Sequence, residues 1–346
     1  MILVFAGAGA SKALNPQHYP TTVEFFEGLP EAVTEAPLFQ RVRQFLGGEN
    51  TEVPLDIEQV LWAIGEWQEF HRLNSDVRAF PAWLIAKNRI RMVLGEGDRF
   101  DGRSAVAKYK EVNAAALDVQ SSINQLVYSL YRRLPTEAEI DEAWAPLLGK
   151  ALEIDPRLDV FTTNYDLVLE SVVEHRGFPI ETGRTQTVTP RLSVKLWDEA
   201  RVDASIRKTG LLTKLHGSLD WIRGDEEDEI FVGTPQFTGE HQRHAIIYPG
   251  FKGMPNRTPF TYFHDYLRSA AEHAAAAIFV GFAFRDDVIR EIVRDRFGSG
   301  IPIVVIGLGG QPPQIPFRKG QYKYLGDGFS RKAVDLALNW VEKALS

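Results

Sequence analysis

The sequence of 346 residues contains no cysteine. This absence excludes disulfide bonds, thiol nucleophiles and every zinc site built on thiolate ligands. No apolar run approaches the roughly 20 residues that a membrane-spanning helix needs. No basic segment precedes the apolar residues at the N-terminus, so the sequence predicts no signal peptide. From these absences we expect a soluble cytoplasmic protein without a membrane partner.

Clusters of positive charge are also missing. The formal net charge is −7, because 39 Lys and Arg residues face 46 Asp and Glu residues. Sequence-independent binding of nucleic acid needs a basic patch or stripe, and the basic residues here are dispersed. We therefore expect no direct contact with nucleic acid. The 44% of hydrophobic residues is typical of a globular protein with a substantial core.

The first apolar segment, residues 2–6, leads directly into the run Gly7-Ala8-Gly9-Ala10-Ser11. Closely spaced glycines after a strand let the backbone turn sharply and bring its N–H groups close to a diphosphate. The third glycine of the dinucleotide fingerprint would stand at position 12, but Lys12 occupies it. The acidic residue expected at the end of a second strand is also missing. The loop therefore predicts nucleotide binding of a kind other than hydride transfer, with a plain tight turn as the alternative.

The pattern of apolar residues changes along the chain. Between about residues 21 and 154 they recur at helical spacing, which predicts a helical insertion. Short apolar strands then return, and helices separate them. Such strands indicate a parallel sheet that is covered on both faces. We expect a Rossmann-like α/β domain of residues 1–20 and 155–346, with residues 21–154 inserted after the first strand.

Four later strands end in polar or glycine-containing loops. Ligands of parallel sheets bind outside the carboxyl ends of the strands, so these loops are expected to form the walls of one site. The loops are Thr162-Thr163-Asn164-Tyr165-Asp166, His216-Gly217-Ser218, Gly281-Phe282-Ala283-Phe284-Arg285-Asp286, and the one that begins at Gly307.

Taken together, these loops resemble the sirtuin (silent information regulator) family, in particular its prokaryotic defence-associated branch. The run from Gly7 matches the opening phosphate loop of the family. The segment Thr163-Asn164-Tyr165-Asp166 is similar to its Thr-Gln-Asn-x-Asp segment, and His216-Gly217 matches its catalytic His-Gly pair. Gly281 resembles the late glycine loop that holds the adenosine end of the dinucleotide. The resemblance covers roughly residues 1–20 and 158–310.

The resemblance implies that NAD+ is the substrate and that its nicotinamide–ribose bond is cleaved through an oxocarbenium-like state. It implies three catalytic residues. Asn164 would orient the ribose or the attacking water, His216 would act as general base, and Asp166 would hold the carboxamide of the leaving nicotinamide. The implied nucleotide-binding residues are Gly7, Ala8, Gly9, Ala10, Ser11, Thr163, Gly217, Gly281, Phe282, Asp286 and Gly307.

The sequence departs from the sirtuin deacetylases because it lacks their four-cysteine zinc module and a recognisable acyl-peptide groove. These departures favour hydrolysis of NAD+ to nicotinamide and ADP-ribose, without a metal. Two alternatives stay open: a non-catalytic nucleotide-binding scaffold subunit of a defence complex, and a zinc-free NAD-dependent protein deacylase. The defence branch implies an effector of antiphage abortive infection that works with an ATPase or an Argonaute-like protein. We also expect a homo-oligomer that assembles through the helical insertion.

Each candidate residue also has a structural interpretation. Asn and Asp are common turn formers and helix caps, and Asp166 is placed to cap a helix that starts near Leu167. A lone His216 is more often structural than catalytic. His241, His244 and His264 have no carboxylate at a supporting spacing, so the sequence predicts no metal site.

Overall fold

The computed structural model describes residues 1–37, 39–40, 42–43, 60, 63, 114, 118–119, 121–184, 190–224, 229–233, 244–246, 258–298, 300–309 and 315–346. The chain divides into two compact units. The first comprises residues 1–21, 129–247 and 252–346, and the second comprises residues 22–128 and 248–251.

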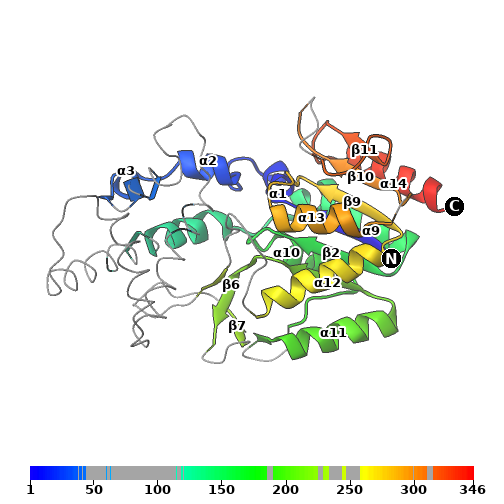
Figure 1. The fold of residues 1–346 in the computed structure, drawn as a ribbon, viewed down its shortest axis with the longest axis horizontal. Coiled ribbons are helices and arrows are strands. Elements are labelled where there is room, and N and C mark those ends of the chain that lie inside the picture. The colour runs from blue at the N-terminus through cyan, green and yellow to red at the C-terminus, as the bar shows by residue number, and fades with distance from the viewer. Residues whose placement is uncertain are drawn as a thin grey trace. The chain divides into compact units, whose positions relative to one another are not determined.

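The first unit is built on a seven-stranded sheet with the order β11-β10-β9-β1-β2-β5-β3. The strands β9, β10 and β11 are labelled in Figure 1. All neighbouring strands in this sheet are parallel. The strands are β1 (Ile2–Ala6), β2 (Leu158–Thr162), β3 (Ile180–Glu181), β5 (Gly210–Lys214), β9 (Ala276–Val280), β10 (Ile303–Ile306) and β11 (Tyr322–Leu325). The predicted parallel α/β fold is therefore confirmed.

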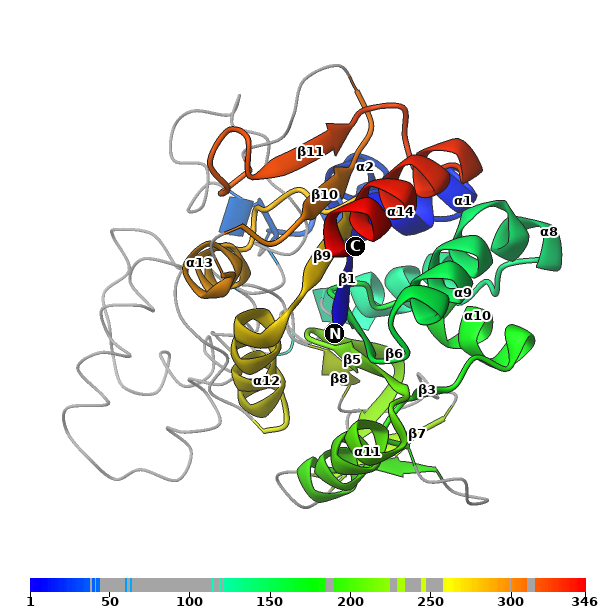
Figure 2. The same cartoon turned by 90° about the vertical axis from the view of Figure 1, so that its right-hand side faces the viewer.

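Helices cover both faces of this sheet (Figure 2). Successive strand residues point to opposite faces, so Ile2 and Val4 enter one core and Leu3 and Phe5 enter the other. The first core is closed by α1 (Ala8–Leu14), η1 (Ile140–Trp144), α9 (Ala145–Ile154), α10 (Val168–Arg176) and α14 (Arg331–Leu345). The second is closed by α11 (Val194–Arg207), α12 (Phe260–His273) and α13 (Asp287–Arg296). Burial on both faces explains why β1, β9 and β10 are continuously apolar.

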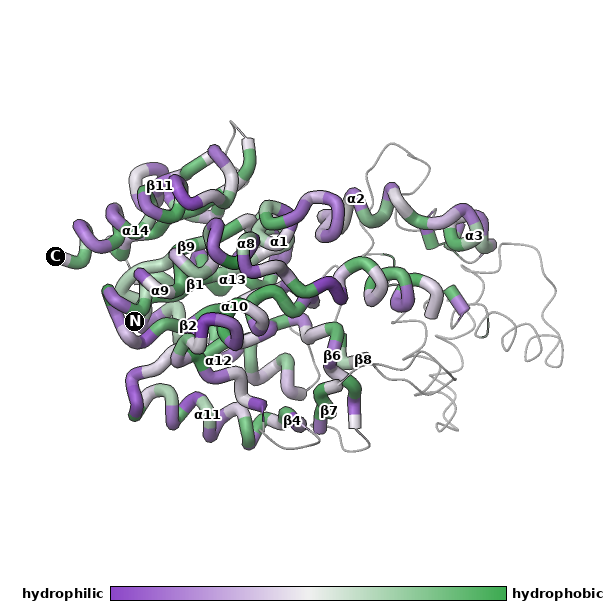
Figure 3. Tube along the Cα trace, turned by 180° about the vertical axis from the view of Figure 1, so that it is seen from behind, coloured by the Kyte–Doolittle hydropathy of each residue, from purple (hydrophilic) through white to green (hydrophobic). Residues whose placement is uncertain are grey.

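The helix boundaries follow from capping residues. Ser193, Asp286 and Ser330 accept hydrogen bonds from the backbone of the first turn of α11, α13 and α14. Such caps satisfy N–H groups that have no partner within the helix. Helix α10 ends at Gly177, whose positive φ of 60° suits glycine. In Figure 3, α14 alternates between hydrophilic and hydrophobic residues, as expected for a helix with one buried face.

The first unit also contains a small antiparallel sheet. Its strands are β4 (Arg191–Leu192), β6 (Gly217–Arg223), β7 (Ile230–Val232) and β8 (His244–Ile246), in the order β4-β7-β6-β8. Gly217 is the first residue of β6 and has a φ of +91°. A Cβ atom there would lie 2.0 Å from the Ala245 carbonyl oxygen, so only glycine fits. This sheet directs the chain away from the end of β5 and leaves His216 at the turn.

The second unit contains α2 (Thr22–Glu27) and α3 (Glu31–Thr34). Most of the predicted helical insertion, including nearly all of residues 44–117, lies outside the described residues. The helices α8 (Glu137–Glu139), η1 and α9 belong to the unit that contains the sheet. The domain division at residues 20 and 155 stays a prediction. Across the part of the chain that is described, no helix is both long and apolar enough to cross a membrane.

Candidate active site

The predicted phosphate loop, residues 7–11, consists of the turn at Gly7 and the first residues of α1, and it packs tightly against the loop that follows β9. The Gly7 N–H donates to the Val280 carbonyl at 2.9 Å, and the Gly9 N–H donates to the Gly281 carbonyl at 3.0 Å. A Cβ on Gly7 would lie 2.6 Å from the Gly281 oxygen, and one on Gly281 would lie 2.1 Å from the Ala10 nitrogen. The close packing of the two segments therefore requires these glycines, independently of any contact with a ligand. Because these two N–H groups already have acceptors, they do not face a diphosphate in this structure.

Asn164 is fixed to the phosphate loop. It lies just beyond β2, and its Nδ2 donates to the Gly7 carbonyl at 3.0 Å and to the Ser11 hydroxyl at 2.9 Å. Its backbone N–H donates to the Thr162 hydroxyl at 3.0 Å. The side chains of Asn164 and Ser11 are both buried. These contacts hold the amide in one orientation at the carboxyl ends of β1 and β2.

Asp166 also contacts the phosphate loop. Its carboxyl group is buried and forms a hydrogen bond with Ser11, and Oδ1 accepts from the Val168 N–H at 3.1 Å. Burial raises the pKa of Asp166, although the positive charge of Lys214 and the Ser11 bond act in the opposite direction. Leu167 is the N-cap of α10 and no side chain caps this helix, so the bond to Val168 is a local turn contact just before it and the capping interpretation is wrong. The contact with Ser11 joins Asp166 to Asn164.

His216 forms a pair with Asp286. Its Nε2 lies 3.0 Å from Oδ2 of Asp286, while Oδ1 of the same carboxyl accepts from the Ile289 N–H at 3.0 Å. Burial acts to raise the pKa of Asp286, but the hydrogen bond and charge of His216 outweigh it and the pKa is lowered. Asp286 is therefore a carboxylate that holds the Nε2 proton of the imidazole. Nδ1 of His216 is buried without a hydrogen-bond partner among the described residues, so its lone pair is unsatisfied.

A second histidine lies beside this pair. The His264 ring stacks on the His216 ring with centroids 6.2 Å apart and planes 16° apart. Burial and the neighbouring His216 lower the pKa of His264 to about 4, and its Nδ1 donates to the Phe260 carbonyl at 2.9 Å. His264 is therefore neutral at pH 7. The regular helical pattern of α12 gave no sign of this neighbour.

Lys214 is a residue that sequence reasoning missed. It ends β5, its side chain is 3% exposed, and its Nζ donates to the Asp166 carbonyl, to the Ser218 hydroxyl at 2.9 Å and to Glu170 at 3.0 Å. It thereby ties the loop of Asn164 and Asp166 to the turn of His216. A lysine within an otherwise apolar strand was the available signal, because an unpaired charge is too costly to bury.

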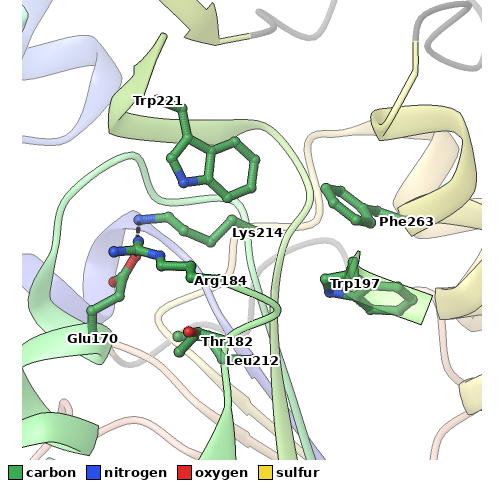
Figure 4. A pocket seen from close by; sticks show the side chains of 8 residues that line it. All are labelled: Glu170, Thr182, Arg184, Trp197, Leu212, Lys214, Trp221 and Phe263. Carbon is green, nitrogen blue, oxygen red and sulfur yellow. Dashed lines mark hydrogen bonds and ion pairs between the residues drawn. The ribbon is translucent and has the colours of Figure 1, made fainter. Parts of the chain in front are cut away.

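A chain of ion pairs extends from Lys214. Glu170 also accepts from Arg184 at 3.0 Å, and Arg184 contacts Asp220 at 3.0 Å. Figure 4 shows Lys214 and Arg184 both reaching Glu170, with Trp197, Trp221 and Phe263 on the other side. The space between them is about 10 Å³, which is enough for one water molecule. This network stiffens the back of the candidate site.

The remaining predicted residues lie at the same edge of the sheet, with different contacts. The Thr163 N–H donates to the Ala6 carbonyl at 3.3 Å. The Phe282 ring packs in the apolar core, with its centroid 4.4 Å from that of Phe5. The Gly307 N–H donates to Leu325 at 3.0 Å and follows β10. The structure thus joins Gly7, Ser11, Asn164 and Asp166 into one group and His216 with Asp286 into another, linked through Lys214 and Ser218.

No group of three His, Cys, Asp or Glu side chains within the described ranges is arranged to hold a metal ion. His241 lies outside these ranges. The expectation of a metal-free site stays a prediction.

Part of this unit is similar to a known family. Residues 159–299 match the family described as the SIR2-like domain. This segment runs from β2 to beyond α13 and contains Asn164, His216 and Asp286. No curated protein matches the chain.

Solved structures include similar folds. A Sir2 homologue in complex with NAD has 14% sequence identity and a TM-score of 0.45, and the alignment covers 100% of this chain and 90% of that one. A mutant Sir2 homologue with 2'-O-acetyl ADP ribose has 14% identity and a TM-score of 0.43, with coverage of 100% and 93%.

Proposed function

We propose that this protein binds NAD+ and hydrolyses it to nicotinamide and ADP-ribose. The observation that carries the proposal is the convergence of two buried groups at the carboxyl edge of the sheet. One is the Asn164 amide bonded to the phosphate loop, and the other is the His216–Asp286 pair. The match of residues 159–299 to the SIR2-like domain supports it.

The proposed reaction breaks the bond between ribose C1' and the pyridinium nitrogen. The bonding electron pair goes to that nitrogen, so nicotinamide leaves as a neutral molecule and the ribose becomes oxocarbenium-like. Asn164 orients the ribose or the attacking water. Water forms the new bond to C1', and its proton passes to Nδ1 of His216, which has a free lone pair because the Nε2 proton points to Asp286. The Asp286 carboxylate then stabilises the imidazolium that forms.

Asp166 is proposed to receive the carboxamide of nicotinamide, since it borders Ser11 and the Asn164 loop. Nucleotide contacts are proposed for the residues at the carboxyl edge. The Ala8 N–H is the better candidate for the diphosphate, because the Gly7 and Gly9 N–H groups are already bonded and the Ser11 hydroxyl is bonded to Asn164 and Asp166. The reaction is proposed to need no metal.

Product analysis tests this function. The full chain is incubated with NAD+ in the presence of a chelator and without any acylated peptide, and the products are separated by chromatography. We expect nicotinamide and ADP-ribose in equal amounts. Formation of O-acyl-ADP-ribose only when an acylated peptide is supplied would instead identify a deacylase. Binding of NAD+ without any product would identify a scaffold subunit.

The biological setting rests on the resemblance alone. We propose a cytoplasmic effector of antiphage defence that assembles as a homo-oligomer and is controlled by a partner such as an ATPase or an Argonaute-like protein. An unrestrained NAD+ hydrolase would drain the cofactor pool of its own cell, so control of this kind is needed.

A further inference from the structure

A cavity of about 100 Å³ lies at the opposite edge of the main sheet from the candidate active site. It is formed at the amino ends of β1, β2 and β5, between α11 and α12. The side chains that matter for its chemistry are Arg157, Asp159, Arg201, Thr209, Tyr266 and His273. It has room for several water-sized positions, and therefore for more than a single ion. Asp159 and Asn164 lie at the two ends of β2, roughly 16 Å apart at about 3.3 Å per residue.

The feature that sets this cavity apart is a buried carboxylate in the central part of the sheet. Asp159 is 5% exposed, and its partners in the neighbouring strands are Leu3 and Leu211. Within this apolar row a leucine or valine would pack without cost, whereas a carboxylate needs compensation. The Tyr266 hydroxyl donates to Oδ2 of Asp159. The fold does not require a charge at this position, which points to a ligand.

Two arginines line the cavity beside Asp159. The guanidinium groups of Arg157 and Arg201 both act on Asp159 electrostatically. Arg201 lies 5.8 Å from the centre of the Tyr266 ring and is held by Asp198 at 2.7 Å. His273 occupies the last turn of α12 and lines the same space.

Thr209 adds an unsatisfied group. Its hydroxyl is buried and has no hydrogen-bond partner in the described part of the chain. Arg157 and His273 are exposed, so the cavity is open to solvent on that side. A ligand can therefore enter past Arg157 and His273 and reach the Asp159 carboxylate and the Thr209 hydroxyl.

We propose that this cavity is a second binding site, for a small phosphorylated sugar. Its phosphate would lie against the guanidinium group of Arg157 and Nη1 of Arg201, whose Nε and Nη2 already donate to Asp198. Its sugar hydroxyls would donate to the Asp159 carboxylate and bond to Thr209. Neither inorganic phosphate, which lacks the sugar hydroxyls, nor an uncharged sugar would satisfy both ends of the site. This inference does not depend on the proposed hydrolysis of NAD+.

Isothermal titration of the full chain with ribose 5-phosphate tests the site, with inorganic phosphate as the second probe. We expect saturable binding of ribose 5-phosphate, and at least about tenfold weaker binding by the Arg157→Gln and Asp159→Asn variants, since each removes a charged hydrogen bond. Inorganic phosphate is expected to bind at least about tenfold more weakly than ribose 5-phosphate, for the same reason. Circular dichroism spectra check that each variant is folded.

Two control variants locate the ligand. Arg207→Gln removes an exposed arginine of α11 that pairs with Asp203 and does not line the cavity, so the affinity should not change. Asn164 lies just beyond the other end of β2, so the Asn164→Ala variant should bind ribose 5-phosphate with unchanged affinity. Absence of saturable binding to the unmodified protein would overturn the proposal. The proposal would also be overturned by any of three results: equal affinity for the two probes, unchanged affinity in Arg157→Gln, or loss of binding in Asn164→Ala. The product analysis with NAD+ is a separate measurement and does not depend on these results.

Discussion

Nε2 of His216 lies 3.0 Å from Oδ2 of Asp286, a residue 70 positions later in the chain. The carboxylate is fixed on its other side as the N-cap of α13, so it cannot follow a rotation of the imidazole. This arrangement holds one tautomer of His216 and leaves Nδ1 as the nitrogen that can accept a proton. Sequence reasoning assigned Asp286 to nucleotide binding. On the geometry we propose that it orients and stabilises His216.

Asp286→Asn tests this role. The amide fills the same space but cannot stabilise an imidazolium, so NAD+ turnover should fall by about 100-fold or more, within the range of general acid–base catalysis. The KM for NAD+ should change little. Steady-state NAD+ cleavage is the measurement. Asp287→Asn is the matched control, because Asp287 is exposed and pairs with Arg290. Equal turnover in the two variants would contradict the proposed pair.

Asn164→Ala and His216→Ala test the catalytic group itself. Each should abolish NAD+ cleavage, because one residue orients the reactant and the other accepts the proton in the same transition state. The double variant should be no slower than the worse single variant, since residues that act as a unit are not additive. Turnover by single and double variants is measured beside their thermal unfolding. Cleavage that survives in the double variant would refute both assignments.

Lys214→Met tests the buried network behind the site. Removal of the Lys214 ammonium leaves the largely buried Glu170 carboxylate with Arg184 as its remaining ion-pair partner among the described residues. The free energy of unfolding should therefore fall by about 3–5 kcal/mol. Adding Glu170→Gln to this variant should restore part of the loss. Urea denaturation measures the free energy of unfolding. Arg207→Met breaks an exposed pair with Asp203 and should change it by less than about 1 kcal/mol. If Lys214→Met behaved like this control, the network would not stabilise the fold.

Asp159→Asn should change how stability depends on pH. Burial raises the pKa of Asp159 from 3.8 to about 6 in the folded protein. Between those pH values the folded state keeps a proton that the unfolded state has lost, so the unfolding free energy contributed by Asp159 falls as the pH rises. The Asn variant has no carboxyl group that loses a proton, so its unfolding free energy does not fall in this way. At pH 7.5 it should exceed that of the unmodified protein by about 3 kcal/mol at most, and at pH 4 the difference should be smaller.

Denaturation of both proteins across this pH range measures the effect. His264, with a folded pKa of about 4 against an ordinary 6.5, acts in the opposite direction, because the unfolded state gains a proton as the pH falls. His264 contributes equally to the unfolding free energy of the Asp159→Asn variant and of the unmodified protein, so its contribution cancels when the two are subtracted. A constant difference between them at every pH would show that the carboxyl group of Asp159 does not titrate in this way.

Assembly should control turnover. We expect a homo-oligomer in solution and a specific NAD+ hydrolysis rate that depends on protein concentration or on an added partner. Light scattering gives the mass, and NAD+ cleavage is followed over the same concentrations. A monomer with full turnover at every concentration would exclude this form of control.

Much of the fold was predictable because it depends on local patterns. Apolar strands that alternate with helices specify a parallel sheet, and the carboxyl edge of such a sheet gathers the loops that follow its strands. The loops of Gly7, Asn164 and His216 were found in this way, since their residues stand directly after strand-forming segments. The predicted cap at Asp166 was wrong, because α10 begins one residue later and Asp166 forms a turn contact with Val168 instead.

Contacts between distant residues were decided only by the tertiary structure. The Asn164 amide meets Ser11 because β2 lies beside β1, although 153 positions separate the two residues. Lys214 reaches Glu170 because β5 pairs with β2, and Asp159 faces Tyr266 because α12 covers that face of the sheet. The sequence determined which loops and side chains were available, through local periodicity and turn chemistry. The order of the strands and the packing of the helices determined which of them meet, because burial and hydrogen bonding are satisfied over the whole fold at once.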